Sequence, residues 1–124
     1  MRIVGELINA SRKKIRDDIK EKNYDAIAKV AKDQAEHGAD FIDVNAGIFV
    51  GHEADYVKWL IKTVQENVEV PCCIDTPDPK VLEEAVKVHE GSPMLNSISL
   101  ESDRWENMIP ILRGTDMKVI ALCM

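Results

Sequence analysis

Aromatic residues are scarce in this sequence: Phe, Tyr and Trp together make up 5% of its 124 residues. Because 45% of the residues are nevertheless hydrophobic, aliphatic side chains must fill the core, and a charged share of 31% is ordinary for a globular domain. No apolar run approaches the roughly 20 residues that a membrane span needs, and no signal-peptide pattern opens the chain. We therefore expect a cytoplasmic protein.

An excess of positive charge is also lacking. The formal net charge is -6 and the pI is near 5.0, which argues against nucleic acid or an anionic membrane as a general partner. Glycine-rich phosphate loops are absent too, because the glycines form neither a GxGxxG fingerprint nor a P-loop. The sequence therefore disfavours a dinucleotide or nucleoside-triphosphate site.

Cysteine and histidine are few, with three of each. Cys72, Cys73 and Cys123 lie in apolar stretches, and we expect buried, reduced thiols that fit a reducing compartment. If the adjacent Cys72 and Cys73 lie on a strand, they point to opposite faces and form neither a disulfide nor a shared metal site. The histidines show no metal-ligand spacing, so the sequence predicts no bound metal.

The spacing of apolar residues predicts strands that alternate with helices. Helices are expected from Asn23 to Gly38, over 54–67, from Asp78-Pro79 to Gly91, and over 102–113. Strands are expected at 2–9, 40–47, 70–75, 93–99 and 118–124. This alternation calls for a parallel α/β sheet. An open doubly wound sheet and part of a (β/α) barrel both satisfy it, and both bind ligands at the carboxyl ends of their strands.

Polar side chains stand where the predicted strands end. Each alone can cap the loop or helix that follows, but all of them together would meet at one end of the sheet. Glu6 lies inside the first apolar strand, where its carboxylate either faces outward against a Lys or Arg or turns toward the same end. These candidate binding residues are Glu6, Asn9, Asp43, Asn45, Asp75 and Asn96.

Carboxylates and amides at one site suit a flat heterocycle that has neighbouring N–H groups. A carboxylate accepts two parallel hydrogen bonds from an amino group and an adjacent ring N–H, while an Asn amide both donates and accepts. The edge of a pterin or of a guanine has this arrangement.

Four segments resemble the pterin-binding family of (β/α)8 barrels. Within it they look most like the methyltetrahydrofolate:corrinoid methyltransferases and the folate domain of cobalamin-dependent methionine synthase. Dihydropteroate synthase is a poorer match, since Asn9-Ala10-Ser11-Arg12 replaces its usual opening and Asn45-Ala46-Gly47 its Gly-Gly-Glu-Ser stretch. The segments are "IVGELIN" (3–9), "GADFIDVNAG" (38–47), "CIDTPDPKVLEEAV" (73–86) and "PMLNSISL" (93–100).

The resemblance implies that residues 1–124 form the N-terminal half of a TIM-barrel domain, about four βα units and a fifth strand. By the same resemblance, Asp75 and Asn96 bind the pterin ring, Asp43 and Asn45 belong to the second strand end of the pocket, and Glu6 and Asn9 belong to the first. Family enzymes of one-carbon metabolism move a methyl group from N5 of a tetrahydrofolate to the cobalt of a corrinoid. Since no Asp-x-His-x-x-Gly motif is present, cobalamin would be carried by a separate protein.

The family residues nearest N5 come from later strands, so no catalytic residue is assigned. The principal alternative is a non-catalytic pterin-binding half-barrel or assembly module. Lesser alternatives are a dihydropteroate synthase-like enzyme and a methyltransferase for another methyl donor or for tetrahydromethanopterin. An apolar fifth strand at an open edge predicts a homodimer or a complementary C-terminal half. The basic segment 11–16 could meet the glutamate tail of a folate, or form a solvated loop or short helix.

Overall fold

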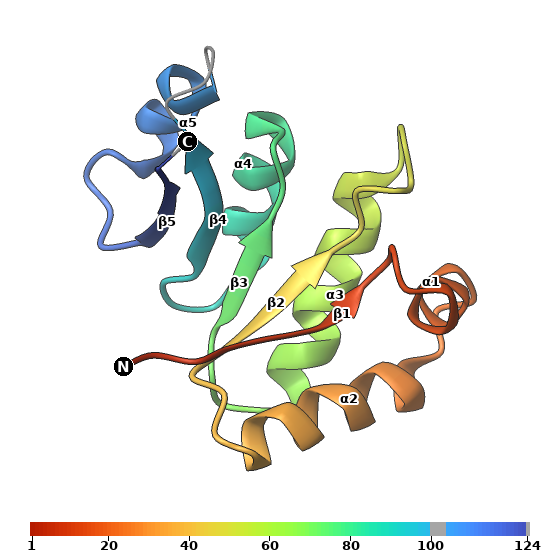
Figure 1. Cartoon of the computed structure of the whole chain (residues 1–124). Coiled ribbons are helices and arrows are strands. Elements are labelled where there is room, and N and C mark those ends of the chain that lie inside the picture. Colours follow the sequence, from red (N-terminus) through yellow and green to blue (C-terminus); the bar gives the residue numbers. More distant parts are fainter. Residues whose placement is uncertain (100–103, 124) are drawn as a thin grey trace.

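The computed structural model describes residues 1–99 and 104–123 and contains a five-stranded parallel sheet (Figure 1). Each strand lies beside the one that precedes it in the chain, in the order β1-β2-β3-β4-β5. A doubly wound sheet reverses its strand order at a switch point, so this order is that of a (β/α) barrel wall. The parallel α/β prediction is confirmed. The strands are β1 (Val4–Asn9), β2 (Phe41–Asn45), β3 (Cys72–Asp75), β4 (Met94–Ser99) and β5 (Lys118–Leu122).

Helices follow the strands closely to the predicted bounds, with one addition. The basic segment forms a short helix, α1, which raises the number of helices from the predicted four to five among the described residues. The predicted start of the last helix at 102 lies outside the described residues. The helices are α1 (Lys13–Lys20), α2 (Tyr24–Glu36), α3 (Glu53–Asn67), α4 (Pro79–Val88) and α5 (Arg104–Leu112).

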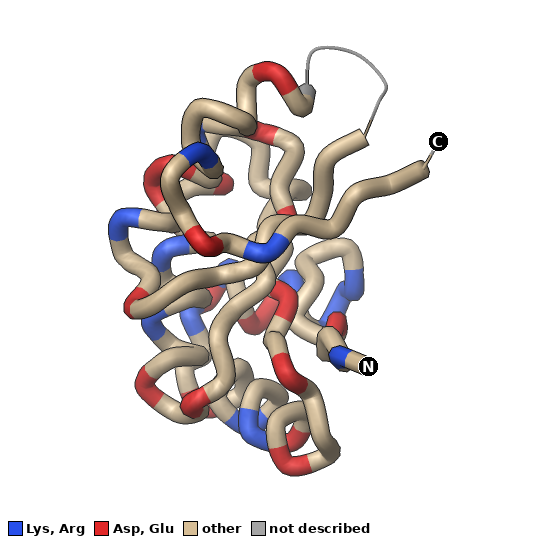
Figure 2. The backbone as a smooth tube through the Cα atoms, turned by 90° about the vertical axis from the view of Figure 1, so that its left-hand side faces the viewer, with Lys and Arg blue, Asp and Glu red and all other residues tan. Residues whose placement is uncertain are grey.

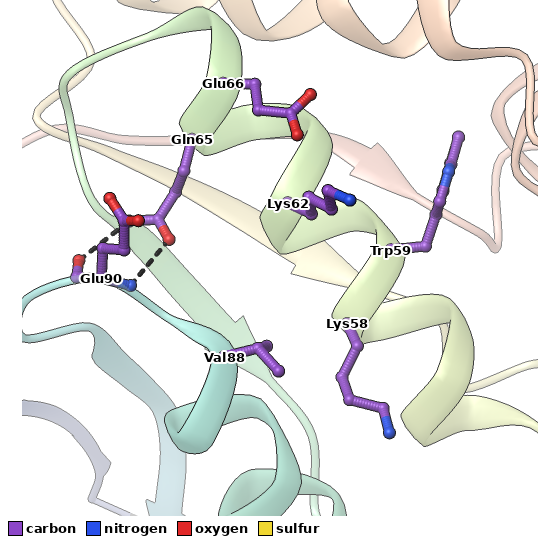
Figure 3. Close-up of a pocket in the computed structure, with 7 residues that line it drawn as sticks. All are labelled: Lys58, Trp59, Lys62, Gln65, Glu66, Val88 and Glu90. Carbon is purple, nitrogen blue, oxygen red and sulfur yellow. Dashed lines mark hydrogen bonds between the residues drawn. The ribbon is translucent and has the colours of Figure 1, made fainter.

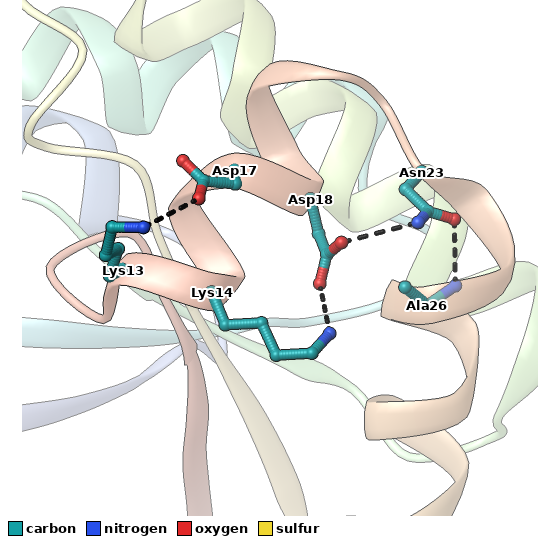
Figure 4. Close-up of polar contacts among 6 residues, drawn as sticks. All are labelled: Lys13, Lys14, Asp17, Asp18, Asn23 and Ala26. Carbon is teal, nitrogen blue, oxygen red and sulfur yellow. Dashed lines mark hydrogen bonds and ion pairs between the residues drawn. The ribbon is translucent and has the colours of Figure 1, made fainter.

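Helix α1 is held by one apolar stripe and by its own charges. Ile15 and Ile19, four residues apart, are its buried side chains. Lys14 pairs with Asp18 at 3.0 Å, and Lys13 lies 3.8 Å from Asp17 (Figure 4). These lysines thus already have anionic neighbours on their own helix. The segment is therefore a short helix rather than a loop, and its contact with the glutamate tail of a folate stays a prediction.

Polar side chains cap both ends of α2 and the start of α4. The Asn23 side chain accepts a hydrogen bond from Ala26 N at the start of α2, and Asp78 accepts one from Lys80 N at the start of α4. His37 Nδ1 lies 2.6 Å from the Asp33 carbonyl oxygen at the end of α2. Gly38 follows with a φ of 97°, a conformation that favours glycine.

The two faces of the sheet carry different side chains. Helices α2, α3 and α4 pack on one face and form the main core with Ile42, Ile74 and Leu95 (Figure 1). The opposite face, called the inner face here, carries a smaller apolar cluster built on Phe41, Cys73 and Met94. Successive strand residues point to opposite faces, which explains this division.

The thiol prediction holds at two of its three positions. Cys72 belongs to the main core and Cys73 to the inner-face cluster, so the adjacent thiols do point apart. Both are fully buried. The expectation for Cys123 was wrong: its side chain is exposed, because it directly follows β5 at the edge of the sheet.

Strand β1 contains an irregularity that α2 stabilises. The pairing register of β1 against β2 shifts between Gly5 and Ile8. Leu7 N, inside this bulge, donates to Gln34 Oε1 of α2 at 3.0 Å. A Cβ atom added at Gly5 would collide with Gln34 Oε1 and lie only 2.9 Å from Gln34 Cδ, so glycine permits this close approach.

The described helices include none that is both long enough and apolar enough to cross a bilayer. Lys and Arg alternate with Asp and Glu along the chain rather than gathering into one field (Figure 2). The negative net charge is therefore spread over the molecule.

Candidate functional site

Asp43, Asp75 and Asn96, called the strand-end cluster below, lie on the inner face of the sheet. Each comes two residues after a member of the inner-face apolar cluster, and residues two apart on a strand share a face. The pairing register sets Asp75 directly opposite Asn96, and Asp43 opposite Cys73. Three predicted site residues from three strands are thus brought together at the carboxyl end of the sheet.

A hydrogen bond across β3 ties the cluster together. Asn96 Nδ2 of β4 donates to Asp43 Oδ2 of β2 at 3.1 Å. Asp43 is 1% exposed, and this desolvation, together with the charges and hydrogen bonding of its carboxyl neighbours, raises its pKa from 3.8 to about 7. The hydrogen bond from Asn96 acts in the opposite direction. The cluster therefore holds a carboxyl group that can carry a proton at neutral pH.

Glu6 lies near enough to this cluster for its charge to raise the Asp43 pKa. It is an exposed residue of the β1 bulge, and the ion pairs among the described residues do not include it. Of the two interpretations of Glu6, an outward salt bridge with Lys or Arg is therefore not observed. Its carboxylate lies within the strand, close to Asp43.

Asn9 and Asn45 stand at the paired ends of β1 and β2, but their amide oxygens bind the loops that follow. Asn9 Oδ1 accepts from Ser11 N at 2.8 Å, and Asn45 Oδ1 accepts from Gly47 N at 2.9 Å. These are the local turns that Asn commonly stabilises. The structure places both residues beside the cluster and gives each a structural role there.

Sequence analysis did not identify two further residues at this end of the sheet, Thr76 and Glu53. Thr76 is 1% exposed, and its Oγ1 donates to Glu53 Oε2 at 2.9 Å. Thr76 Oγ1 also accepts a hydrogen bond from Asp78 N at 3.2 Å. Thr76 N donates to the Asn96 carbonyl oxygen at 3.1 Å. Thr76 therefore joins the ends of β3 and β4 to the start of α3. The position of Thr76 directly after Asp75 was the one available signal.

A hollow of about 180 Å³ opens at this end of the sheet, lined by Asp75, Thr76, Pro77, Asn96 and Ser97. Pockets for whole small ligands usually measure about 300–1,000 Å³, so this one is sized for an edge of a ring system.

A larger hollow, about 400 Å³, lies elsewhere, between α3 and the end of α4 (Figure 3). Its lysines sit on the outer helical surface, and Gln65 there binds the Glu90 backbone at 2.9 Å. It contains no strand-end residue, so we place the site at the strand-end cluster.

The chemistry of the cluster is that of a hydrogen-bond acceptor. None of the ion pairs among the described residues neutralises Asp43 or Asp75. An unpaired carboxylate at the edge of a pocket favours a ligand with adjacent N–H groups. The described residues contain no group of three or more His, Cys, Asp or Glu side chains placed to hold a metal ion.

Comparison with known proteins shows the family. The profile of the pterin-binding enzymes matches residues 5–124, and the chain belongs to this family. It is 36% identical over 116 residues to the methylcorrinoid:tetrahydrofolate methyltransferase of Eubacterium limosum, an alignment that covers 94% of this chain and 43% of that protein. The crystal structure of dihydropteroate synthase from Thermus thermophilus matches with a TM-score of 0.60 and 25% identity, over 87% of this chain and 37% of that one. The chain thus spans less than half the length of these relatives.

Proposed function

We propose that this chain is the pterin-binding part of a methyltransferase that transfers a methyl group between N5 of a tetrahydrofolate, or a related pterin, and a corrinoid. The observation that carries the proposal is the strand-end cluster: Asp43, Asp75 and Asn96 meet at the carboxyl end of a barrel-type sheet in a pterin-binding family member. The higher identity to a methyltransferase than to a dihydropteroate synthase favours methyl transfer.

The pterin would lie with its amino and ring N–H groups against Asp75, with Asn96 beside it on the next strand. Asp43 supports Asn96, and Glu6, Asn9 and Asn45 complete the same rim. Methyl transfer requires an oriented ring and stabilisation of the nitrogen that loses its methyl group. The described residues would supply the orientation, and Asp43, buried behind Asn96, can hold a proton next to the pocket at neutral pH.

The corrinoid supplies the cobalt that exchanges the methyl group, and we propose that a separate protein carries it. The name of the Eubacterium limosum relative gives the transfer from methylcorrinoid to tetrahydrofolate. A catalyst accelerates a reaction in both directions, so the proposal concerns the pair of substrates and not the direction. Buried thiols at Cys72 and Cys73 fit a reducing cytoplasmic setting.

Calorimetric titration of methyltetrahydrofolate into wild type and Asp75→Ala tests the binding step. Loss of a carboxylate that accepts two hydrogen bonds should weaken binding by about tenfold or more. Asp40→Asn is a control, because Asp40 lies just before the amino-terminal end of β2 and its side chain accepts a hydrogen bond from Ile3 N, far from the strand-end cluster. Equal affinity of wild type and Asp75→Ala would contradict the assignment of Asp75.

Methyl transfer between methyltetrahydrofolate and free cob(I)alamin separates the enzyme from the non-catalytic pterin-binding module. Transfer by this chain supports an enzyme that is sufficient by itself. Transfer that requires an added C-terminal half of the barrel shows a site divided between two segments. Pterin binding without transfer in either case would favour the non-catalytic module.

A further inference from the structure

The short segment that follows β3 has few backbone donors to hold it in place. Its residues Pro77 and Pro79 carry no N–H group. The donors that remain are Thr76 N, which binds the Asn96 carbonyl oxygen at 3.1 Å, and Asp78 N, which binds Thr76 Oγ1 at 3.2 Å. Both bonds involve Thr76, so this one residue fixes the backbone of the segment.

The hydroxyl group of Thr76 is occupied by the protein itself. Its Oγ1 donates to Glu53 Oε2 at 2.9 Å, at the start of α3. Because a Thr hydroxyl has one hydrogen, this bond leaves none for a ligand. Thr76 follows Asp75 directly, so the two side chains point to opposite sides, and Thr76 is 1% exposed. Thr76 therefore acts on a ligand through its neighbours and not through a hydrogen bond from its own hydroxyl.

We propose that Thr76 is a positioning residue of the pterin site, whose hydroxyl anchors the end of β3 to α3 and thereby holds Asp75 and Asn96 in the geometry that receives the ring. Thr76 is joined to Asp75 by the peptide bond and to the Asn96 backbone by a hydrogen bond. These two side chains lie opposite each other on neighbouring strands. The inference rests on the proposed function and adds to it a residue that prepares the site before the ligand arrives.

Thr76→Val keeps the shape of the side chain and removes the hydroxyl. The N–H of Asp78 then loses its acceptor, and the segment loses its bond to Glu53. A segment that is no longer fixed in advance must be ordered when the ligand binds, which costs affinity. We expect methyltetrahydrofolate to bind about tenfold more weakly to Thr76→Val. Thr76→Ser retains the hydroxyl and should bind within about threefold of wild type.

The test is calorimetric titration of methyltetrahydrofolate into wild type, Thr76→Val, Thr76→Ser and Thr63→Val, each first shown to be folded by circular dichroism. Thr63 is the matched control: it is also 1% exposed, and its Oγ1 donates to the Trp59 carbonyl oxygen at 2.9 Å. It lies about 15 Å along α3 from Glu53, so Thr63→Val should lose stability and keep its affinity.

Glu53→Ala and Glu53→Gln are the second pair of variants if Thr76→Val does not fold. Both remove the same charge, but only glutamine retains an oxygen that accepts from Thr76 Oγ1. Comparing these two variants therefore isolates the hydrogen bond. We expect Glu53→Ala to bind methyltetrahydrofolate about tenfold more weakly than Glu53→Gln.

Three results would overturn the inference. Wild-type affinity in folded Thr76→Val, or equal affinities of the two Glu53 variants, shows that the hydroxyl does not prepare the site, while the proposed pterin binding stands. A loss of affinity in Thr63→Val as large as that in Thr76→Val shows that general destabilisation is the cause. Failure of folded wild type to bind methyltetrahydrofolate would overturn the proposed function and this inference together.

Discussion

Asp43 places a carboxyl group where almost no water reaches it and where other carboxyl groups are near. Its pKa is raised from 3.8 to about 7, mainly by desolvation. Between these two pH values the folded protein holds a proton that the unfolded chain has released. The free energy of unfolding therefore decreases as the pH rises through this window, and the unfavourable charge is fully present above it.

Asp43→Asn should consequently stabilise the folded protein at high pH. We expect its free energy of unfolding at pH 8 to exceed that of wild type by on the order of 1–3 kcal/mol, and the difference to shrink toward zero near pH 4. Urea denaturation of both proteins across this range measures it. A variant less stable than wild type at pH 8 would contradict the raised pKa. Such a gain in stability would agree with the common finding that residues of binding sites are kept for function at the expense of folding stability.

His89, at the end of α4, titrates with the opposite sign. Its Nε2 accepts from Cys72 N at 3.1 Å, and its Nδ1 lies 3.1 Å from the Gly91 carbonyl oxygen, so the neutral ring satisfies both groups. Burial lowers the pKa of His89 below 6.5. The unfolded chain then binds a proton more readily than the folded one, so this contribution to stability is present above pH 6.5 and is lost as the pH falls below it.

We expect His89→Leu to be less stable than wild type by about 1–3 kcal/mol at pH 8, because the buried Cys72 N loses its acceptor and leucine supplies no other. Near pH 5 the gap should narrow, since wild type then carries the cost of keeping His89 neutral. Comparing the two proteins at each pH cancels the contribution of Asp43. A gap that widens on acidification would show that His89 is protonated in the folded state.

At this scale the sequence predicted which side chains gather at the strand ends but not how each is used. Asn9 and Asn45 were indistinguishable from Asn96, because an Asn after a strand can bind either its own loop or a ligand. Only the register that sets Asn96 beside Asp75, and across from Asp43, separates them. The hydrogen bond between Thr76 and Glu53 joins residues that are 23 positions apart, so no local sequence pattern could predict it.

At the scale of elements, the bulge in β1 depends on the contact between Gly5 and α2. A Cβ atom at Gly5 would lie 2.9 Å from Gln34 Cδ and 3.2 Å from Gln34 Cβ, and closer still to Gln34 Oε1. Gln34 is buried, and its Oε1 is bound to Leu7 N, so it cannot simply move away. The fit is therefore a joint property of β1 and α2.

Gly5→Ala should destabilise the protein by about 1–3 kcal/mol through overpacking. Gln34→Ala alone loses the hydrogen bond to Leu7 N and should also destabilise it. If the two residues collide as the structure indicates, the double variant costs less than the sum of the single changes, and a double-mutant cycle by urea denaturation measures this coupling. Strict additivity would contradict the close approach.

Sequence periodicity was a good guide to elements with broad apolar stripes and a poor one to α1. Helix α3 was expected from 54 and begins at Glu53, and α4 begins at the predicted Pro79. Helix α1 has only Ile15 and Ile19 as buried residues, so most of its surface is charged. A segment of that kind reads equally well as a solvated loop until its packing against neighbouring elements is known.

At the scale of the whole molecule, the strand order is the feature that decided between the two predicted architectures. Both an open doubly wound sheet and a barrel produce alternating strands and helices, and the order of strands in space is not written in local periodicity. The order β1-β2-β3-β4-β5 leaves β1 and β5 as edge strands in the described part of the chain. Their outer backbone groups have no strand partner there.

The edge at β5 also exposes apolar surface. A hollow of about 210 Å³ beside it is lined by Ile98, Ser99, Trp105, Ala121 and Leu122. Unpaired strand edges with apolar side chains favour association between chains. We therefore predict that the 124-residue chain associates with itself at micromolar concentrations through this edge.

Leu122→Lys should weaken this association, because Leu122 is 39% exposed on the edge strand and a lysine there opposes strand pairing. Sedimentation velocity over a concentration series should show wild type in an assembly larger than a monomer and the variant shifted toward the monomer. Val50→Lys is the matched control: Val50 is 88% exposed in the loop before α3, away from the edge, and should leave sedimentation unchanged. A wild-type chain that stays monomeric at every concentration would contradict the prediction, and an equal effect of both variants would show that charge, rather than the β5 edge, governs association.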